Sequence, residues 1–301
     1  MELTNADRIV FPEDGISKGE VFDYYVGVAD RMLPFVARRA LTVERYPKGI
    51  DGGGFMQKNA PDHYPEEVIG RFEVSRAGGG TTTYPVVDTA GGIAFFANLG
   101  VITFHTPPAT VDDFLHPDWV IWDLDPPQGR VDLARRAAHA LQAVLEGLDI
   151  PSLVMTSGSS GYHLRTPLDR GTNITVVAEV ARGTAALAAA AHPDLLTLEF
   201  RKAERGVRVF VDWLRNAPLS TSVVPWSLRA KRGAPVAVPL AWEEIDTVLP
   251  DGIGLHSVGE WLEADPWAGL KPINLTGAAD MVKRALDEAG IRLEPFDRFR
   301  S

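Results

Sequence analysis

The chain has 301 residues, 45 % of them hydrophobic, which is enough for one large domain or two modest ones around a sizeable core. It contains no cysteine, so disulfides, thiolate zinc sites and cysteine nucleophiles are excluded. The formal net charge of −10 argues against a general nucleic-acid coat, because non-specific binding depends on neutralising phosphates. Basic residues still cluster at 201–208 and 229–232, so one basic groove is compatible with the acidic total.

The same composition bears on membranes and targeting. No run approaches the roughly 18 apolar residues of a membrane span. The first residues include Glu2, Asp7 and Arg8 and lack the apolar core of a signal peptide. We therefore expect a soluble protein of the cytoplasm with no membrane partner.

The first expected element is a helix from Lys18 towards Arg31, which Ser17 would cap and Pro34 would disturb at its end. The elements after it are, in chain order, a strand at 41–46, loops at 49–54 and 77–80, a strand at 81–87, a short helix at 93–98, strands at 101–105 and 119–124, a helix at 131–148, a strand at 152–156, a loop at 157–161, a helix at 176–191, strands at 207–213 and 226–228, and helices at 255–263 and 278–289. Strands and helices mix without a regular βαβ rhythm, which favours an α+β fold over a doubly wound sheet.

A boundary near 235–239 would separate a core from a C-terminal tail. The tail contains Trp261, Trp267 and Leu270, so we expect it to pack on the core.

The strand at 119–124 leads into two acidic residues, Asp123 and Asp125. Residues i and i+2 of a strand project from the same face, so the two carboxylates would stand side by side and repel each other. A hard cation such as Mg²⁺ or Mn²⁺ would stabilise them, since it prefers carboxylate oxygens together with substrate phosphates. The plainer alternative is that the aspartates only open the turn at Pro126 and Pro127.

A second hydrophobic strand, at 207–213, carries the single acid Asp212. A buried unpaired carboxylate is costly, and a shared cation would neutralise it as a third ligand. The alternative is an ion pair with Arg208 or Arg215.

A glycine- and serine-rich loop at 157–161 follows a buried strand and precedes His163. Such loops expose backbone N–H groups that bind anions, although an ordinary turn has the same composition. His105 also ends a strand, where a structural histidine is the plainer interpretation. Basic residues flank the acidic strands, and arginine forks fit triphosphate oxygens well, although a run of charge is usually a solvated face.

Taken together, these residues resemble the primase–polymerase domain of bacterial ATP-dependent DNA ligase D, within the archaeo-eukaryotic primase superfamily. The resemblance extends over nearly the whole chain, through residues 5–12, 18–25, 45–49, 55–58, 82–85, 101–105, 123–125, 157–163, 211–212 and 225–229. It implies an α+β primase-type catalytic core with mixed and antiparallel sheets flanked by helices. We expect a single primase–polymerase domain over 1–301, with its core at about 5–240 and a C-terminal helical segment at about 241–292 packing on it.

The resemblance also implies an activity and its residues. The family is a template-directed DNA/RNA polymerase that adds NTPs or dNTPs to a primer 3′-hydroxyl at gaps or DNA ends, as in non-homologous end joining or gap-filling repair. Two Mn²⁺ or Mg²⁺ ions would be held by Asp123, Asp125 and Asp212. The implied nucleotide-binding residues are His105, Ser157, Ser159, His163, Arg205, Arg215 and Arg229, and the implied DNA-binding residues are Arg8, Lys18, Arg45, Phe55 and Lys58.

Within this set, Lys18 and Arg8 would bind the 5′-phosphate of a DNA end or gap, and Phe55 would stack on a template base. The implied partners are such DNA, a separate DNA ligase and a Ku-type protein, in the bacterial cytoplasm in association with the nucleoid. We expect a stand-alone form or one domain of a longer chain, since ligase and phosphoesterase sequences are absent.

The sequence departs from the family pattern at four positions. Ser160 and Ser220 stand where relatives can carry lysine, Met56 replaces an aromatic residue, and Glu44 stands where a basic residue can occur. These departures leave the aspartates intact but thin the positive charge expected around a triphosphate. Two rival hypotheses therefore remain open: a catalytically weakened module that binds DNA ends and recruits a ligase, and a two-metal nuclease.

Overall fold

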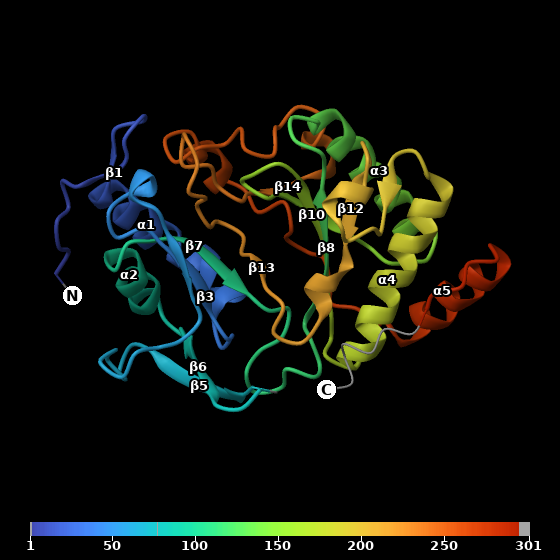
Figure 1. Ribbon diagram of the computed structural model, residues 1–301, viewed down its shortest axis with the longest axis horizontal. Helices are drawn as coiled ribbons and strands as arrows, with labels where there is room; N and C mark the ends of the chain where they lie inside the picture. The colour runs from blue at the N-terminus through green and yellow to red at the C-terminus, as the bar shows by residue number, and fades with distance from the viewer. Residues whose placement is uncertain (1, 77, 295–301) are drawn as a thin grey trace.

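The computed structural model describes residues 2–76 and 78–294, and two sheets form the body of this part of the chain (Figure 1). The larger sheet has the strand order β11-β12-β8-β10-β9-β14, and the smaller one has the order β13-β7-β3-β4. The strands of the larger sheet are β8 (Trp119–Asp125), β9 (Leu153–Thr156), β10 (Tyr162–Pro167), β11 (Leu196–Thr197), β12 (Val209–Asp212) and β14 (Pro239–Leu240). The strands of the smaller sheet are β3 (Thr42–Arg45), β4 (Phe55–Gln57), β7 (Val101–Thr106) and β13 (Ser222–Val223).

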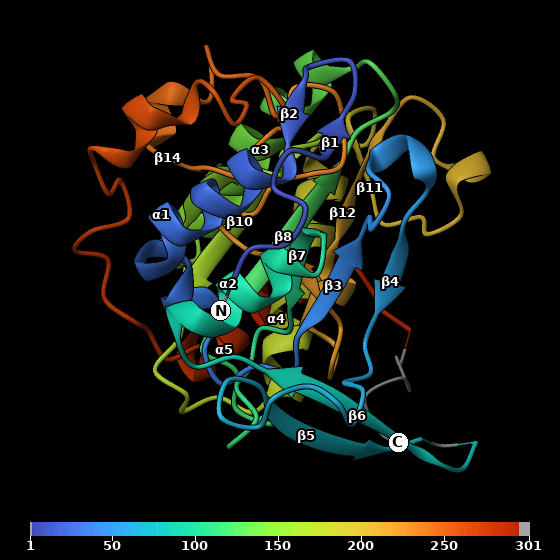
Figure 2. The ribbon, with the colours of Figure 1, turned by 90° about the vertical axis from the view of Figure 1, so that its left-hand side faces the viewer.

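Two short hairpins extend the body. The first, β1 (Ile9–Phe11) with β2 (Ile16–Ser17), precedes α1, and the second pairs β5 (Gly70–Ser75) with β6 (Thr81–Val86). Figure 2 shows the second hairpin projecting below β3 and β4.

Helices cover both sheets. The helices α1 (Lys18–Val36) and α2 (Ala90–Asn98) pack on each other beside the smaller sheet, and α3 (Val131–Glu146) and α4 (Ile174–Ala191) lie beside the larger one (Figure 1). The last helix, α5 (Thr276–Glu288), packs on the outer side of α4. Short 3₁₀ turns lie at Ile50–Gly52, Lys202–Glu204, Trp213–Asn216, Trp242–Glu244 and Val258–Leu262. The sheets are mixed and antiparallel with helices beside them, so the predicted α+β fold is confirmed.

The first helix begins at its predicted cap and ends later than expected. Ser17 and Glu20 form a reciprocal capping box, in which the Ser17 N–H donates to Glu20 Oε2 at 2.8 Å. The helix continues through Pro34 to Val36, because Met32 and Val36 are fully buried and their packing holds the last turn together. Burial thus outweighs the hydrogen bond that a proline inside a helix removes.

Of the described residues, one helix, α4, is by length and composition apolar enough to cross a membrane. The expectation that no segment approaches a membrane span is therefore wrong for α4. Packing explains its composition, because it lies between α3, α5 and β8. Its buried residues are Ile174, Val177, Ala178, Val180, Ala181, Gly183, Thr184, Ala185, Ala186 and Ala188.

Other local predictions were also wrong. The segment predicted as a strand at 226–228 makes only an isolated bridge from Leu228 to Val236, and Trp226 has a positive φ of 68° that ends any extended run. The helix predicted at 255–263 is reduced to the 3₁₀ turn Val258–Leu262. Strand β10 was not predicted as a strand, although it pairs along its length with β8.

The C-terminal segment packs on the rest of the chain, through Trp267 and α5 among other contacts. The Trp267 indole packs against Phe35 and Trp119, and its Nε1 donates to the backbone oxygen of Val154 at 3.1 Å. Farther along, Ile273 bridges to Leu168, and α5 packs on α4. These contacts agree with a tail that lies on the core, while the division into core and tail stays a prediction.

Candidate active site

Three neighbouring strands place the acidic residues. In the antiparallel register of the larger sheet, Asp123 of β8 lies opposite His163 of β10 on one side and Asp212 of β12 on the other. The alternation of β8 explains which residues face the site. Trp122 and its alternate neighbours lie in the core, where the Trp122 indole donates to Ala181 O on α4 at 3.0 Å. Asp123 and Asp125 therefore share the opposite face.

Arg215 joins two of the carboxylates. Its Nε lies 3.0 Å from Asp123 Oδ2 and 3.1 Å from Asp212 Oδ2, and its Nη1 donates to the Thr221 backbone oxygen at 3.2 Å. The other oxygen of Asp123 lies 3.2 Å from His163 Nε2. Asp212 Oδ1 accepts the Leu214 N–H at 3.0 Å, which starts the turn that carries Arg215.

The carboxylates differ strongly in their electrostatics. Burial would raise the pKa of Asp123, but His163 and Arg215 outweigh it and hold that pKa well below its usual value. Burial, with repulsion from Asp123, raises the pKa of Asp125 to about 7. Burial also raises the pKa of Asp212, against the attraction of Arg215.

The donor set suits a hard cation, although the side chains are not arranged around one. Within residues 2–76 and 78–294, no group of three His, Asp or Glu side chains is placed to hold a metal ion. The reason is visible in the geometry, since the Arg215 guanidinium occupies the space between Asp123 and Asp212. The Asp125 carboxylate, by contrast, makes no hydrogen bond or ion pair with any described residue, and a divalent cation would offset the burial and the repulsion that raise its pKa.

The loop at 157–161, which we call the serine loop, is closed by its own first residue. Ser157 Oγ accepts the N–H groups of Ser159 and Gly161, each at 3.2 Å. A Cβ at Gly161 would lie 1.8 Å from the Leu124 backbone oxygen, so only glycine allows the loop to approach the end of β8 this closely. Two of the loop's backbone N–H groups are thus used inside the loop and are not exposed to bind an anion.

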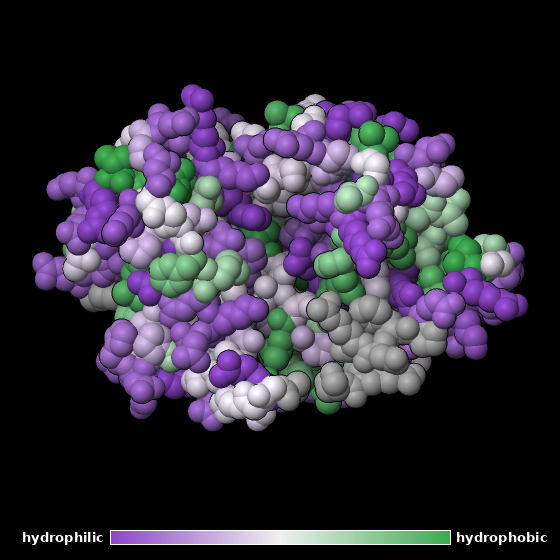
Figure 3. Space-filling model, viewed as in Figure 1, coloured by the Kyte–Doolittle hydropathy of each residue, from purple (hydrophilic) through white to green (hydrophobic). Residues whose placement is uncertain are grey.

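A cavity of about 140 Å³ connects these parts and lies between the two sheets. Figure 3 shows that the molecular surface is hydrophilic and hollowed near its middle, where β8 and β13 lie in Figure 1. The predicted site residues that line the cavity are His105, Asp123, Asp125, Ser157, Ser159, His163, Arg215 and Arg229. The fold therefore brings most of the predicted catalytic and nucleotide-binding residues together from both sheets.

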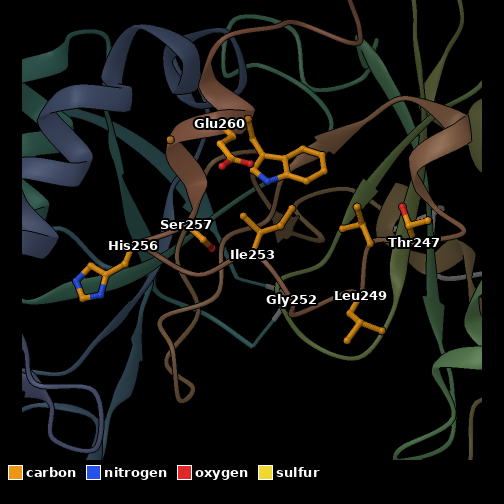
Figure 4. A pocket seen from close by; sticks show the side chains of 10 residues that line it. Thr247, Leu249, Gly252, Ile253, His256, Ser257 and Glu260 are labelled. Carbon is orange, nitrogen blue, oxygen red and sulfur yellow. The ribbon is translucent and has the colours of Figure 1, made fainter.

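A larger cavity, of about 610 Å³, lies among loops of the C-terminal segment (Figure 4). It is lined by Leu249, Ile253 and Trp261, and the His256 ring points away from it towards Glu20, at 3.0 Å. It lacks a set of carboxylates and basic groups facing one another, so the smaller cavity is the better candidate for chemistry.

Comparison with known proteins identifies the family to which this site belongs. The family model described as the LigD primase-polymerase domain matches residues 17–267. The chain belongs to this family. The resemblance inferred from the sequence is confirmed.

The curated relatives of this chain are longer proteins. LigD of Mycobacterium tuberculosis, a multifunctional non-homologous end joining DNA repair protein, is 36 % identical over 256 residues, which cover 81 % of this chain and 33 % of that protein. The bifunctional non-homologous end joining protein LigD of Bacillus subtilis is 30 % identical over 252 residues, which cover 83 % of this chain and 40 % of that protein. The chain thus spans well under half the length of these relatives.

A solved structure is similar over the whole domain. The polymerase domain from Mycobacterium tuberculosis ligase D, solved in complex with DNA, matches with a TM-score of 0.76 and 30 % sequence identity. The match covers 99 % of this chain and 97 % of that one.

Arg205, which was assigned to the nucleotide, does not line the cavity. Arg205 donates to the backbone oxygens of Glu199 and Phe200, at 2.9 and 2.8 Å, and its guanidinium lies 4.0 Å from the Phe210 ring centroid. Because Phe210 pairs with Asp125 in the register, Arg205 still contributes positive charge near the acids. Its direct contact with a nucleotide remains a prediction.

The residues assigned to a 5′-phosphate lie near the N-terminus, apart from the cavity. Lys18 is only 5 % exposed, and its ammonium donates to Asn98 Oδ1 at 2.8 Å and to both the backbone oxygen and the hydroxyl of Thr4. Arg8 donates to the Pro47 backbone oxygen. All three ammonium donors of Lys18 are therefore satisfied inside the protein.

The residues assigned to template DNA lie on the smaller sheet. Phe55 is 51 % exposed on β4, and Arg45 stacks over its ring at 5.5 Å while donating to Gln57 Oε1 at 2.9 Å. Met56 is also exposed, at 49 %, and Lys58 is exposed beside them. An exposed aromatic ring backed by a cation suits base stacking, and these roles remain predictions.

The sequence did not single out two further features of the site. Glu44, noted only as a departure, lies 3.7 Å from His105 Nε2, and this histidine lowers the pKa of Glu44. Arg165 is buried beneath the acids and donates to Ser222 Oγ and to the Val223 backbone oxygen, at 3.0 and 2.7 Å. A charged residue two positions after His163, on the same strand face, was the signal that would have found it.

Proposed function

We propose that this chain is a metal-dependent nucleotidyl transferase that extends a primer 3′-hydroxyl, directed by a template, at gaps or ends of DNA. The observation that carries the proposal is the set of Asp123, Asp125 and Asp212 on two adjacent strands, of which Asp123 and Asp125 line a cavity together with Arg229. Membership of the LigD primase-polymerase family and the likeness to a polymerase domain solved with DNA support it.

The three aspartates would hold two Mg²⁺ or Mn²⁺ ions. When bound, such ions lower the pKa of an attacking hydroxyl and stabilise the charge on a departing pyrophosphate. Asp123 is positioned for this by His163 and Asp212 by the Leu214 N–H, so both carboxylates keep fixed orientations. The Asp125 carboxylate has no partner among the described residues, so its oxygens are available to bind an ion.

The other residues of the cavity would position the nucleotide. Arg229 donates to the Ser157 backbone oxygen at 3.1 Å, which leaves further guanidinium donors for phosphate oxygens. His105 faces the cavity from β7, and burial lowers its pKa, so that it stays neutral and can pair with a ribose or phosphate group as a hydrogen-bond partner. Positioning and charge neutralisation account for most of the catalysis in phosphoryl transfer.

The wider setting of the reaction is part of the same proposal. The relatives are non-homologous end joining proteins, which supports a role in end joining, with a DNA ligase and a Ku-type protein as partners in the bacterial cytoplasm at the nucleoid. The assay should first distinguish polymerisation of ribonucleotides from polymerisation of deoxyribonucleotides.

The test uses a 5′-phosphorylated gapped duplex with Mn²⁺ or Mg²⁺ and either NTPs or dNTPs. We expect the wild type to lengthen the primer and Asp125→Asn to abolish lengthening while still binding the duplex. Asp194→Asn, which changes an exposed aspartate after α4, is the matched control and should extend normally. Shortening of the primer would point to a nuclease, and retention without extension to an end-binding module, and either outcome would overturn the proposal.

A further inference from the structure

A basic turn lies against the serine loop. The turn, residues 229–234, is tied back to the chain by the Arg229 N–H, which donates to Pro235 O at 2.8 Å. From this turn, the Lys231 ammonium donates to Ser159 Oγ at 2.6 Å. The sequence counted Lys231 only among a cluster of basic residues, and 72 positions separate it from the serine that it contacts.

Two of the three cations in the turn, Arg229 and Lys231, make no ion pair with a described carboxylate. Of the described residues, none forms a carboxylate ion pair with Lys231 or Arg229, whereas the adjacent Arg232 pairs with Glu13 at 3.4 Å. Burial and the charge of Arg229 lower the pKa of Lys231, against the weaker attraction of Asp251. Holding like charges together costs free energy, and a bound anion would recover it.

The serine loop carries no cation that could bind an anionic ligand. Its Ser159 and Gly161 amides are taken by Ser157 Oγ, and position 160 is a serine, so the loop supplies no cation of its own. A Cβ at Gly158 would lie 2.7 Å from Arg229 Cγ, which shows how closely the basic turn packs on the loop. The turn thus places positive charge directly beside Ser159.

We propose that Lys231 binds the terminal phosphates of the incoming nucleoside triphosphate, together with Arg229, and so supplies from a distant turn the cation that position 160 lacks. This assignment rests on the proposed function, because it names the part of the substrate that the turn contacts. An ammonium has three donors, and one held by Ser159 leaves two for phosphate oxygens. Ser159, which lines the cavity, is then a positioning residue for the lysine.

The test compares binding of a nucleoside triphosphate and of the matching monophosphate by calorimetry, in the presence of Mg²⁺. We expect Lys231→Ala to weaken triphosphate binding about tenfold, as the loss of one charge-assisted contact implies, and to change monophosphate binding less than about twofold. The matched control is Arg232→Ala, which removes the same charge from the same turn but not a contact with the serine loop, and which should bind both nucleotides normally.

A compensating variant sharpens the result. Adding Ser160→Lys to Lys231→Ala returns a cation to the loop and should restore most of the triphosphate affinity. Thermal unfolding of each variant separates loss of fold from loss of binding.

Four outcomes would overturn the inference. They are an unchanged triphosphate affinity in Lys231→Ala, equal losses in Lys231→Ala and Arg232→Ala, equal losses for triphosphate and monophosphate, and no rescue by Ser160→Lys. If only the inference fails, the wild type still binds triphosphate and extends primers. A wild type that neither binds triphosphate nor extends a primer removes the proposed function as well.

Discussion

Replacing Arg215 by methionine tests the electrostatic account of the site, because this arginine neutralises two carboxylates at once. Its Nε lies 3.0 Å from Asp123 Oδ2 and 3.1 Å from Asp212 Oδ2. Methionine keeps much of the side-chain volume and removes the charge, so the carboxylates would repel one another without compensation.

The size of the effect follows from exposure. The Asp123 and Asp212 side chains are 12 and 10 % exposed, but that of Arg215 is 34 % exposed. Breaking a buried pair costs about 3–5 kcal/mol and an exposed one contributes about 0.2–1 kcal/mol, so we expect a loss of about 2–3 kcal/mol without divalent ions.

Metal ions should reduce this difference. A ligand at about 100 times its dissociation constant stabilises a fold by about 2.7 kcal/mol. In the variant, no arginine competes with the metal ion for the two carboxylates. Arg215→Met should therefore gain more stability from Mn²⁺ than the wild type does. The assay is urea unfolding followed by tryptophan fluorescence, with EDTA or with Mn²⁺.

The control is Arg208→Met, because among the described residues the Arg208 guanidinium donates to the backbone oxygens of Arg205 and Glu204 and to no carboxylate. It should cost less than about 1 kcal/mol, with no dependence on Mn²⁺. An equal loss for Arg215→Met in EDTA and in Mn²⁺ would refute the idea that the arginine and the metal ion neutralise the same carboxylates.

Further predictions concern the cap of α1, the Lys18 ammonium and the buried Arg165. Ser17→Ala should destabilise the protein by about 1 kcal/mol in urea unfolding, since it removes the cap of α1. The cap lowers the pKa of Glu20, so its contribution is present above the unfolded pKa of a glutamate, about 4.3, and the difference between wild type and Glu20→Gln should shrink as the pH falls below it. Asn98→Ala removes an acceptor from the Lys18 ammonium and so frees one of its donors for a phosphate. We expect the variant to prefer 5′-phosphorylated over 5′-hydroxyl duplex more strongly than the wild type does, as measured by fluorescence anisotropy. Burial lowers the pKa of Arg165 to about 9, yet Arg165→Met should still cost about 1–3 kcal/mol in urea unfolding, because it leaves two acceptors of β13 unpaired.

Local patterns were sufficient for the acidic strand and its neighbours. The hydrophobic run of β8 with aspartates two positions apart predicted side chains on one face, and the fold places them there. The amphipathic pattern of α3 and the Ser17 cap of α1 were equally readable, since each depends on residues within one or two turns of helix. The ends of elements were less certain, as the continuation of α1 through Pro34 shows.

Pairing across the sheet was not readable from the sequence. Every residue of β10 is buried, so the strand has no polar alternation to mark it, yet it places His163 opposite Asp123. Arg205 and Arg215 look alike in the sequence, but one is bonded to its own loop and the other bridges two carboxylates.

The sequence by itself determined the family, the α+β class and the acidic residues, because these depend on motifs and on spacing within single elements. Only the tertiary structure decided which cations meet them. Asp123 and Arg215 are 92 positions apart, and Ser159 and Lys231 are 72 apart. Such contacts depend on strand register and on loop packing across the whole domain, and no local spacing in the chain encodes them.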